Sequence, residues 1–513
     1  MSGRIRGHRL SYPSMLGAYI AINGIPDSYI LIDGPDCALY KSHFIHGRHD
    51  LNCTLLDING KHRVCFTNIC AQSVTKDHND VILRKVHQME VLDNSKAIYL
   101  TALPGCSLTG VDYDHLMRGA GMFMEKQSIS IPPTSLVGDW MDGFSITMRT
   151  TVRHMEFKEA DPKPENVALI GYMYDRDEGD HRGNIKEMRR LITALGLNLK
   201  TVWFSNTPYH ELEKQAGQCG TVVSFPHGRE AGEELAKKIG AENYIAAELP
   251  FGLQATERWL KAIAVATGKE KEAKKLIQEE RRRVLGQVEW IVPYIFLHKQ
   301  ASFIGDPYHM EGFMEICEDL GMSVRDCFLT SRERAVSDEA TGKADTILFE
   351  PDIYHPDVNN FLGDPTELVV TTTNDITRIF RWHAVEKFCV VEHGFPSYFH
   401  HALVDEPYLG YEGFLSFTGR MANALHHKRR LQLVKGDSDE EDDEHVMREE
   451  FERYKKETNP DVSGHSNGSN GSNGGKKHGS PLDMDEPVAA NGSNGHSNGS
   501  NGVKKEENSP VIG

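Results

Sequence analysis

The sequence predicts an α/β protein made of three Rossmann-like domains with parallel sheets, followed by a disordered C-terminal tail. Three observations lead to this fold class. Short apolar runs alternate with amphipathic stretches of helical period. Most of the apolar runs end in a turn that contains glycine or proline. This alternation is repeated along the chain, and it is typical of parallel sheets that helices cover on both faces.

The first unit, residues 1–160, contains two strands that are each followed by a turn and a cysteine. The apolar run 29–32 leads through a Gly-Pro turn to Cys37, and the run 97–102 leads through a Pro-Gly turn to Cys106. Helical spacing resumes after Cys37, which places its thiol near a helix N-terminus, where the thiol pKa is lowered and the metal-binding thiolate is favoured. The alternative for an isolated cysteine is a buried residue that packs as a small hydrophobe.

The second unit, residues 161–295, and the third unit, residues 296–435, repeat the strand–helix alternation. A linker at 161–164 opens the second unit, and a Gly-Asp-Pro turn at 305–307 follows the first strand of the third. Strands are predicted at 166–172, 199–204, 220–225, 244–247, 301–304, 323–329, 345–350, 368–371 and 387–391. Helices are predicted at 185–195, 230–239, 310–320 and 410–425, with one long charged helix at 256–285.

The segment 436–513 differs from the rest in composition. It begins with an acidic run and continues with repeats of Asn, Gly and Ser. Such a segment has too few apolar residues to form a core, so we expect it to be disordered.

Composition excludes several classes of function. The chain has 513 residues and a net charge of −17. With 9 basic and 17 acidic residues, the stretch 435–513 carries −8 of that charge, which leaves a mildly acidic body. Because phosphate binding needs a basic surface, nucleic acid is not an expected partner. No apolar run approaches the roughly 20 residues of a membrane span, and no export signal follows the basic N-terminus, so we expect a cytoplasmic protein.

The cysteines favour metal or redox chemistry. The chain has nine, an odd number, which argues against a disulfide framework in a cytoplasmic protein. Five of them fall within the first 106 residues: Cys37, Cys53, Cys65, Cys70 and Cys106. In a reducing compartment such a concentration of thiols indicates metal or redox chemistry. His43, His46 and His49 are a further candidate metal site, with a solvated helix face as the alternative.

Several short motifs, taken in order, resemble the component 1 proteins of nitrogenase and its relatives, especially the β-type subunit. The resemblance covers roughly residues 8–430. It is carried by Leu16-Gly17-Ala18, the stretch from Asp33 to Tyr40, the stretch from Cys106 to Asp112, Gly138 to Gly143, Gly305-Asp306-Pro307, Gly394-Phe395-Pro396, His400-His401 and Leu409 to Gly413.

The resemblance implies a subunit that pairs with a homologous component 1 subunit, as a heterodimer or heterotetramer, and holds an iron-sulfur cluster at their interface. It implies that Cys37 and Cys106 are cluster ligands. Iron-sulfur clusters are held by thiolates, and turns at strand ends are suited to deliver them. Electrons would come from an ATP-dependent iron-sulfur reductase, since this chain has no phosphate-binding Gly-x-x-x-x-Gly-Lys-Ser/Thr loop of its own.

The sequence also departs from the family pattern. Ser11-Tyr12-Pro13-Ser14 stands where the family has its first cluster cysteine, so a [4Fe-4S] cluster with ligands shared across the interface is favoured over a larger one. Cys65 or Cys70 are candidate substitute ligands, with buried structural residues as the alternative. Asp33 replaces a family histidine, and it either tunes the cluster or caps the turn.

The family's active-site metal cofactor is bound in another subunit type by a cysteine and a histidine, and this pair is not found here. Cys219 lies in about the right domain, but its surroundings do not support such a role. The leading hypothesis is therefore an enzyme subunit that relays single electrons from the reductase through the interface cluster to a substrate. Two alternatives are a non-catalytic scaffold for assembly of a metal cofactor and a metal-free binding protein.

Overall fold

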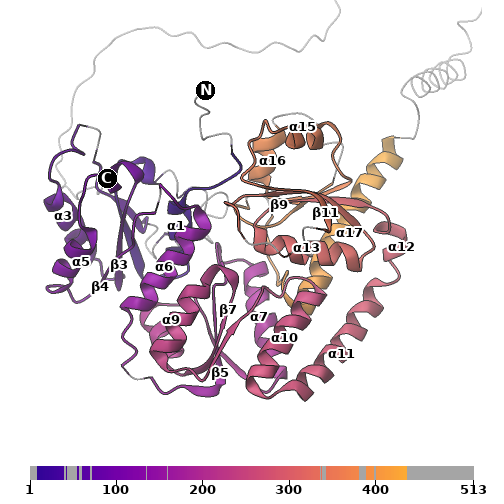
Figure 1. The fold of residues 1–513 in the computed structure, drawn as a ribbon, viewed down its shortest axis with the longest axis horizontal. Helices are drawn as coiled ribbons and strands as arrows, with labels where there is room; N and C mark the ends of the chain where they lie inside the picture. Colours follow the sequence, from indigo (N-terminus) through magenta and orange to yellow (C-terminus); the bar gives the residue numbers. More distant parts are fainter. Residues whose placement is uncertain are drawn as a thin grey trace, which may run out of the picture. The chain divides into compact units, whose positions relative to one another are not determined.

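The structure is a computed structural model in which strands and helices form three parallel sheets (Figure 1). All the strand pairs are parallel, as the alternation of strands and helices predicts. The residues described are 9–39, 42, 55–56, 61–69, 72–134, 136–158, 160–334, 337, 342–380, 389–397 and 400–435.

The first sheet has the strand order β2-β1-β3-β4 and is covered on both faces. Its strands are β1 (Ser28–Asp33), β2 (Val64–Phe66), β3 (Ala97–Ala102) and β4 (Gln127–Ser130). Leu31 and Leu100 pack on one face with helices α3 (Asn79–Glu90) and α5 (Tyr113–Gly121). Ile30 and Ile32 pack on the other face with α1 (Ser14–Asn23) and α6 (Trp140–His154). Burial on both faces explains why these strands read as continuous apolar runs.

The second sheet has the order β6-β5-β7-β8. Its strands are β5 (Lys163–Ile170), β6 (Asn198–Val202), β7 (Cys219–Ser224) and β8 (Asn243–Ala246). The accompanying helices are α7 (Gly179–Ala194), α8 (Tyr209–Ala216), η2 (Pro226–Gly228) and α9 (Arg229–Ile239), followed by α10 (Leu253–Thr267), α11 (Glu270–Val288) and α12 (Val292–Ile295).

The third sheet has five strands in the order β11-β10-β9-β12-β13. They are β9 (Gln300–Gly305), β10 (Ser323–Leu329), β11 (Ala344–Phe349), β12 (Leu368–Thr371) and β13 (Cys389–Glu392). Its helices are α13 (Pro307–Asp319), α15 (Pro356–Gly363), α16 (Thr373–Phe380) and α17 (Gly410–Lys435). We propose domain borders near residues 160 and 295, because each falls between the last helix beside one sheet and the first strand of the next.

Three predicted elements differ from the structure. The single helix expected at 256–285 is two helices, α10 and α11, because Gly268 adopts a left-handed backbone with φ of +67°. The linker at 161–164 is partly strand, since β5 begins at Lys163. Helix α7 begins at Gly179, six residues before the first apolar residue that predicted it. Its first turn is rich in buried polar residues, so the apolar periodicity that predicts a helix begins only later in the sequence.

Some expectations fall outside the described residues. These are the histidines at 43, 46 and 49, the candidate ligand Cys70, strand residues 387 and 388, and the tail at 436–513. Within the described part, no helix combines the length and the apolar character that crossing a bilayer requires.

Helices α1 and α6 cross at two glycines. A Cβ atom added at Gly17 would lie 1.7 Å from the carbonyl oxygen of Trp140, and one added at Gly143 would lie 1.8 Å from that of Ser14. Both neighbours are backbone atoms and cannot rotate away. Contact between the two helices therefore depends on the absence of side chains at these positions.

We expect Gly143→Ala to lower the free energy of unfolding by about 1–3 kcal/mol, because the methyl group must push the two helices apart. Gly286→Ala is the matched control. Gly286 is also helical, but no described atom lies within 4 Å of an added Cβ. That variant should gain about 0.5–1 kcal/mol from its better helix propensity. Urea unfolding of both variants checks the prediction, and equal effects would contradict it.

Candidate functional site

The two predicted ligand cysteines follow neighbouring strands at the same edge of the first sheet. Strands β1 and β3 are paired so that Asp33 lies opposite Ala102, the last residue of each strand. Cys37 and Cys106 each come four residues later. The pairing continues into the turn, where the Leu103 N–H donates to the Asp33 carbonyl oxygen at 2.9 Å. Cys37 opens a helical turn as predicted and is exposed, whereas Cys106 is 3% exposed.

The Cys106 thiol sits in a short helix, α4 (Pro104–Ser107), above the first sheet's core. Its burial, and then the nearby Asp33 carboxylate, raise the pKa of Cys106 to about 11. Without a metal ion this thiol is therefore protonated at neutral pH. A bound metal would displace that proton, since metal binding to thiols is coupled to their deprotonation.

Asp33 is fully buried and accepts hydrogen bonds from side chains. The Thr67 and Tyr113 hydroxyls both donate to its carboxylate at 2.7 Å, and His78 Nε2 lies 3.0 Å from it. The neighbouring turn amide, Gly34 N–H, donates to Thr67 Oγ1 at 2.9 Å instead. The interpretation of Asp33 as a turn-capping carboxylate is therefore wrong, because its oxygens serve a buried side-chain network.

His78 is placed to balance the charge of Asp33. Its Nδ1 lies 2.9 Å from the carbonyl oxygen of Lys76 and its Nε2 lies 3.0 Å from Asp33, so both ring nitrogens face acceptors. Burial lowers the pKa of His78, but its hydrogen bonds to Lys76 and Asp33 raise that pKa overall. An imidazolium fits this position, and it offsets a negative charge next to Cys106.

Cys65, the other candidate ligand among the described residues, does not lie in a turn after a strand. Cys65 lies within β2 opposite Leu31, one residue before the strand ends, and its burial raises the pKa of Cys65 to about 11. Cys219 is buried in β7 of the second sheet, where burial raises its pKa. In the described part of the chain, no three side chains of His, Cys, Asp or Glu are arranged to hold one metal ion. A complete ligand set would thus need groups from elsewhere.

Tyr12 occupies the region where a cysteine was expected from the family pattern. It is buried, and its hydroxyl donates to Asp375 of α16 at 2.7 Å. Its ring meets Trp140 and Phe395 edge-on, with centroid distances of 6.2 and 6.3 Å. The segment before α1 therefore holds the first sheet's helices to residues of the third sheet, which is a structural role.

Asp375 gives this contact a pH dependence. Burial raises the pKa of Asp375 to about 6, although hydrogen bonds from Tyr12 and Thr372 and the charge of Arg378 oppose the shift. The pKa of Asp375 is higher in the folded state than in the unfolded chain. The ionised carboxylate therefore destabilises the fold, and its protonation removes that destabilisation. We expect the stability of the wild type relative to Asp375→Asn to rise by about 1–2 kcal/mol between pH 7.5 and pH 4.5. Urea unfolding at both pH values tests this, and parallel pH curves would contradict it.

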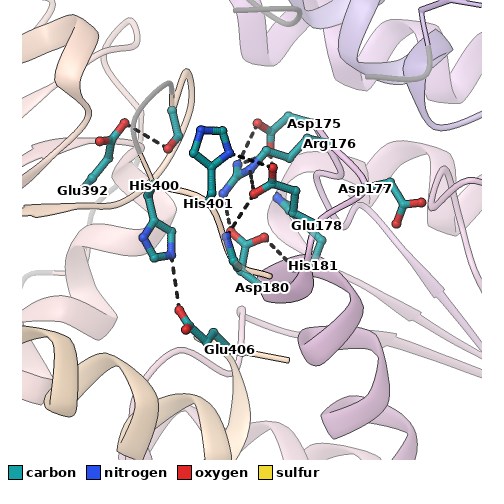
Figure 2. Close-up of polar contacts among 12 residues, drawn as sticks. Asp175, Arg176, Asp177, Glu178, Asp180, His181, Glu392, His400, His401 and Glu406 are labelled. Atoms are coloured by element: carbon teal, nitrogen blue, oxygen red, sulfur yellow. Dashed lines mark hydrogen bonds and ion pairs between the residues drawn. The ribbon is translucent and has the colours of Figure 1, made fainter. Parts of the chain in front are cut away.

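A second candidate site is a polar cavity of about 40 Å³ lined by the loop after β5, the start of α7, β13 and α17. Figure 2 shows the charged side chains that gather there. Arg176 pairs with Asp175 at 3.1 Å and with Asp180, and it lies 3.7 Å from Glu178. His181 Nε2 lies 2.8 Å from Asp175. All five side chains are at least nine-tenths buried.

Arg176 and His181 stabilise the ionised form of two carboxylates in this cluster. Burial alone would raise the pKa values of Asp175 and Asp180, but Arg176 and His181 hold both below the usual range, so the carboxylates are ionised. A volume of 40 Å³ accommodates about three water molecules. A metal cofactor of many atoms does not fit this space.

The sequence reasoning missed this cluster. Only a charged loop was expected between the strand at 166–172 and the helix at 185–195, although seven of the eight residues 175–182 are Asp, Glu, Arg or His, which was a signal. A loop at the carboxyl end of a parallel strand is where ligands and functional groups usually gather.

Three parallel sheets with flanking helices in one chain, with two thiols at one sheet edge and a polar cavity elsewhere, define an α/β protein of Rossmann-like sheets. The chain belongs to the nitrogenase component 1 type oxidoreductase family, whose sequence model matches residues 13–426. This confirms the family resemblance and the predicted fold class.

Individual relatives are distant in sequence. The chain is 20% identical over 353 residues to the vanadium-iron protein beta chain of a nitrogenase from Trichormus variabilis, covering 62% of this chain and 73% of that one. It is 21% identical over 327 residues to an iron-iron protein beta chain from Rhodobacter capsulatus, covering 59% and 68%. The solved structure of nitrogenase Cp1 at pH 6.5 superposes with a TM-score of 0.71 at 16% identity, covering 86% of this chain and 96% of that one. This last similarity concerns the fold alone.

Proposed function

We propose that this chain is a subunit of a nitrogenase-like reductase and contributes Cys37 and Cys106 to an iron-sulfur cluster, most simply [4Fe-4S], at the interface with a homologous component 1 subunit. The observation that carries the proposal is the register of β1 and β3, which brings both thiol-bearing turns to one sheet edge. Adjacent parallel strands lie about 4.8 Å apart, a separation suited to two ligands of one cluster.

The surroundings of the two turns fit an interface. Leu108 and Val137, in the loops after β3 and β4, are 73% and 70% exposed, and these loops leave the sheet at the same edge as Cys37. Exposed apolar side chains next to an incomplete ligand set suit a partner chain that buries them and supplies the remaining thiolates.

In this proposal a bound cluster would accept and release single electrons, which an ATP-dependent iron-sulfur reductase delivers and a substrate receives. The chain's own residues hold the thiols in place and set the local charge. The Asp33 carboxylate next to Cys106 disfavours further negative charge there, and the His78 imidazolium offsets the charge of Asp33. The complex would work in the cytoplasm, since its thiols require reducing conditions.

The test is anaerobic co-purification of the chain with its homologous subunit, followed by iron and sulfide analysis. We expect brown protein with about four irons per interface. Cys37→Ala and Cys106→Ala should each lose most of that iron. Cys219→Ala is the matched control, because this thiol is buried in β7 far along the chain from the two turns. An iron-free wild-type complex, or a Cys37→Ala, Cys106→Ala double variant that keeps its iron, would contradict the proposal.

The scaffold alternative requires a space in the chain that can hold a metal cofactor. A scaffold must house a metal cofactor during assembly, and the 40 Å³ cavity is too small for one. Substrate turnover that needs both ATP and the reductase would distinguish the two functions, since a scaffold would show none.

A further inference from the structure

Arg420 of α17 is a partly buried cation without a carboxylate in direct contact. Its guanidinium lines the polar cavity, hydrogen bonds to the carbonyl oxygen of Glu392 and lies 5.8 Å from the ring centroid of Phe417. Among the described residues, no carboxylate lies within 4 Å of it. Burial lowers the pKa of Arg420, and the charges of Asp180, Glu406 and Glu392 only partly oppose this shift. A guanidinium has five N–H donors, so most of its donor capacity remains available.

Two histidines that line the same cavity have a ring nitrogen that makes no hydrogen bond within the described part of the chain. His393 is 6% exposed, stacks on Phe251 with ring centroids 5.0 Å apart, and has no hydrogen-bond partner at Nε2 among the described residues. His400 Nε2 likewise makes no hydrogen bond there and lies 3.5 Å from Glu406. Leaving a buried polar atom unpaired costs about 1–3 kcal/mol, so two such atoms beside Arg420 around one space indicate a missing ligand.

The charge of Arg420 acts on both histidines. Burial and then the charge of Arg420 lower the pKa of His400 to about 4, and burial, His309 and Arg420 lower that of His393 well below its usual value. Both rings are therefore neutral at pH 7 and present one N–H each. A bound anion would accept from these groups and would neutralise Arg420.

The acidic residues of the cavity do not take this role. Asp175 and Asp180 are paired with Arg176, and Asp306 lies 2.7 Å from His227. Glu392 accepts a hydrogen bond from Ser397 at 3.0 Å. Of the arginines in the lining, Arg176 is thus neutralised and Arg420 is not. This asymmetry selects an anion over a cation.

The volume sets the size of the ligand. About 40 Å³ holds about three water-sized groups, which matches an ion of three or four non-hydrogen atoms. We propose that the cavity binds a small monovalent oxyanion of the formate or acetate class, held by Arg420 and by N–H donors of His393 and His400. The proposal does not depend on the iron-sulfur cluster, because none of these residues belongs to the first sheet.

The experiment is titration of the full chain with sodium formate at pH 7 and constant ionic strength, with sodium chloride as the reference, followed by calorimetry and thermal unfolding. We expect saturable binding with a dissociation constant in the millimolar range, together with a rise in melting temperature. Arg420→Met should weaken formate binding by about tenfold or more. Citrate, which is too large for the cavity, should not bind at concentrations that saturate with formate.

A second cavity variant and a control variant make the formate titration interpretable. If Arg420→Met does not fold, His393→Phe preserves the ring stacking on Phe251 and should still weaken formate binding severalfold. Arg182→Met, on the exposed side of α7, is the control and should bind formate as the wild type does. Absence of saturable formate binding to the wild type, unchanged affinity in both cavity variants, or equal binding of citrate would each overturn the proposal. Iron content is measured separately, so failure here leaves the cluster proposal standing.

Discussion

Arg176→Met is expected to lower the free energy of unfolding by about 3–5 kcal/mol at pH 7.5. The guanidinium is the shared partner of Asp175, Glu178 and Asp180, all of which are less than one-tenth exposed. Its removal leaves ionised carboxylates buried without a matching charge, and breaking a buried ion pair on one side is strongly destabilising. Urea unfolding followed by tryptophan fluorescence measures the change.

The loss should become smaller as the pH falls. In the wild type, Arg176 holds the pKa of Asp175 and of Asp180 below its usual value, so their contribution to stability is lost on acidification. In the variant, burial raises those pKa values, and protonation then relieves the repulsion. Arg182→Met is the matched control on the same helix. Its ion pair with Asp177 spans 3.2 Å but is partly exposed, so its loss should cost less than about 1 kcal/mol. Equal losses in the two variants would contradict the prediction.

Arg63→Met should have an effect of similar size for a different reason. Arg63 is completely buried, and its guanidinium donates to the carbonyl oxygens of Ile22 and Ile25 at 3.1 and 2.8 Å and also to that of Ser28. These carbonyls lie at the end of α1, in the turn that follows and at the first residue of β1, and the end of a helix leaves acceptors unpaired. Methionine fills the volume but donates nothing, so we expect a loss of about 3–5 kcal/mol.

Arg189→Met provides the comparison for Arg63. Arg189 is exposed and donates to a single carbonyl oxygen, that of Leu199, at 2.6 Å. Water can replace this bond, so we expect a loss below about 1 kcal/mol. Similar unfolding midpoints for the two variants would show that the buried hydrogen bonds of Arg63 contribute little.

The strands were predictable because burial on both faces leaves a strong local signal. The runs at 97–102, 323–329 and 368–371 coincide with β3, β10 and β12. Helix borders were less accurate. The charge pattern of 256–285 continues across Gly268, so side-chain spacing alone gave no sign of the break between α10 and α11.

The candidate sites were predictable only in part. Cys37 and Cys106 were found because a turn after a strand is a local feature, and their adjacency follows from strand pairing. The hydrogen-bond networks around these residues could not be predicted from the sequence. Asp33, His78 and Tyr113 are up to 80 residues apart in sequence, and Arg420 reaches its cavity from the last described helix. Such contacts depend on how whole elements pack, which no short stretch of sequence encodes.

The pairing of β1 with β3 has a consequence for assembly. Because backbone hydrogen bonds fix the two turns relative to each other, the two thiols of the proposed cluster site would be held in place before any partner arrives. Little conformational entropy remains to be lost at these turns on association. Formation of the complete site would then resemble the docking of two preformed halves rather than folding around a metal, and chelation of the iron should leave the first sheet intact.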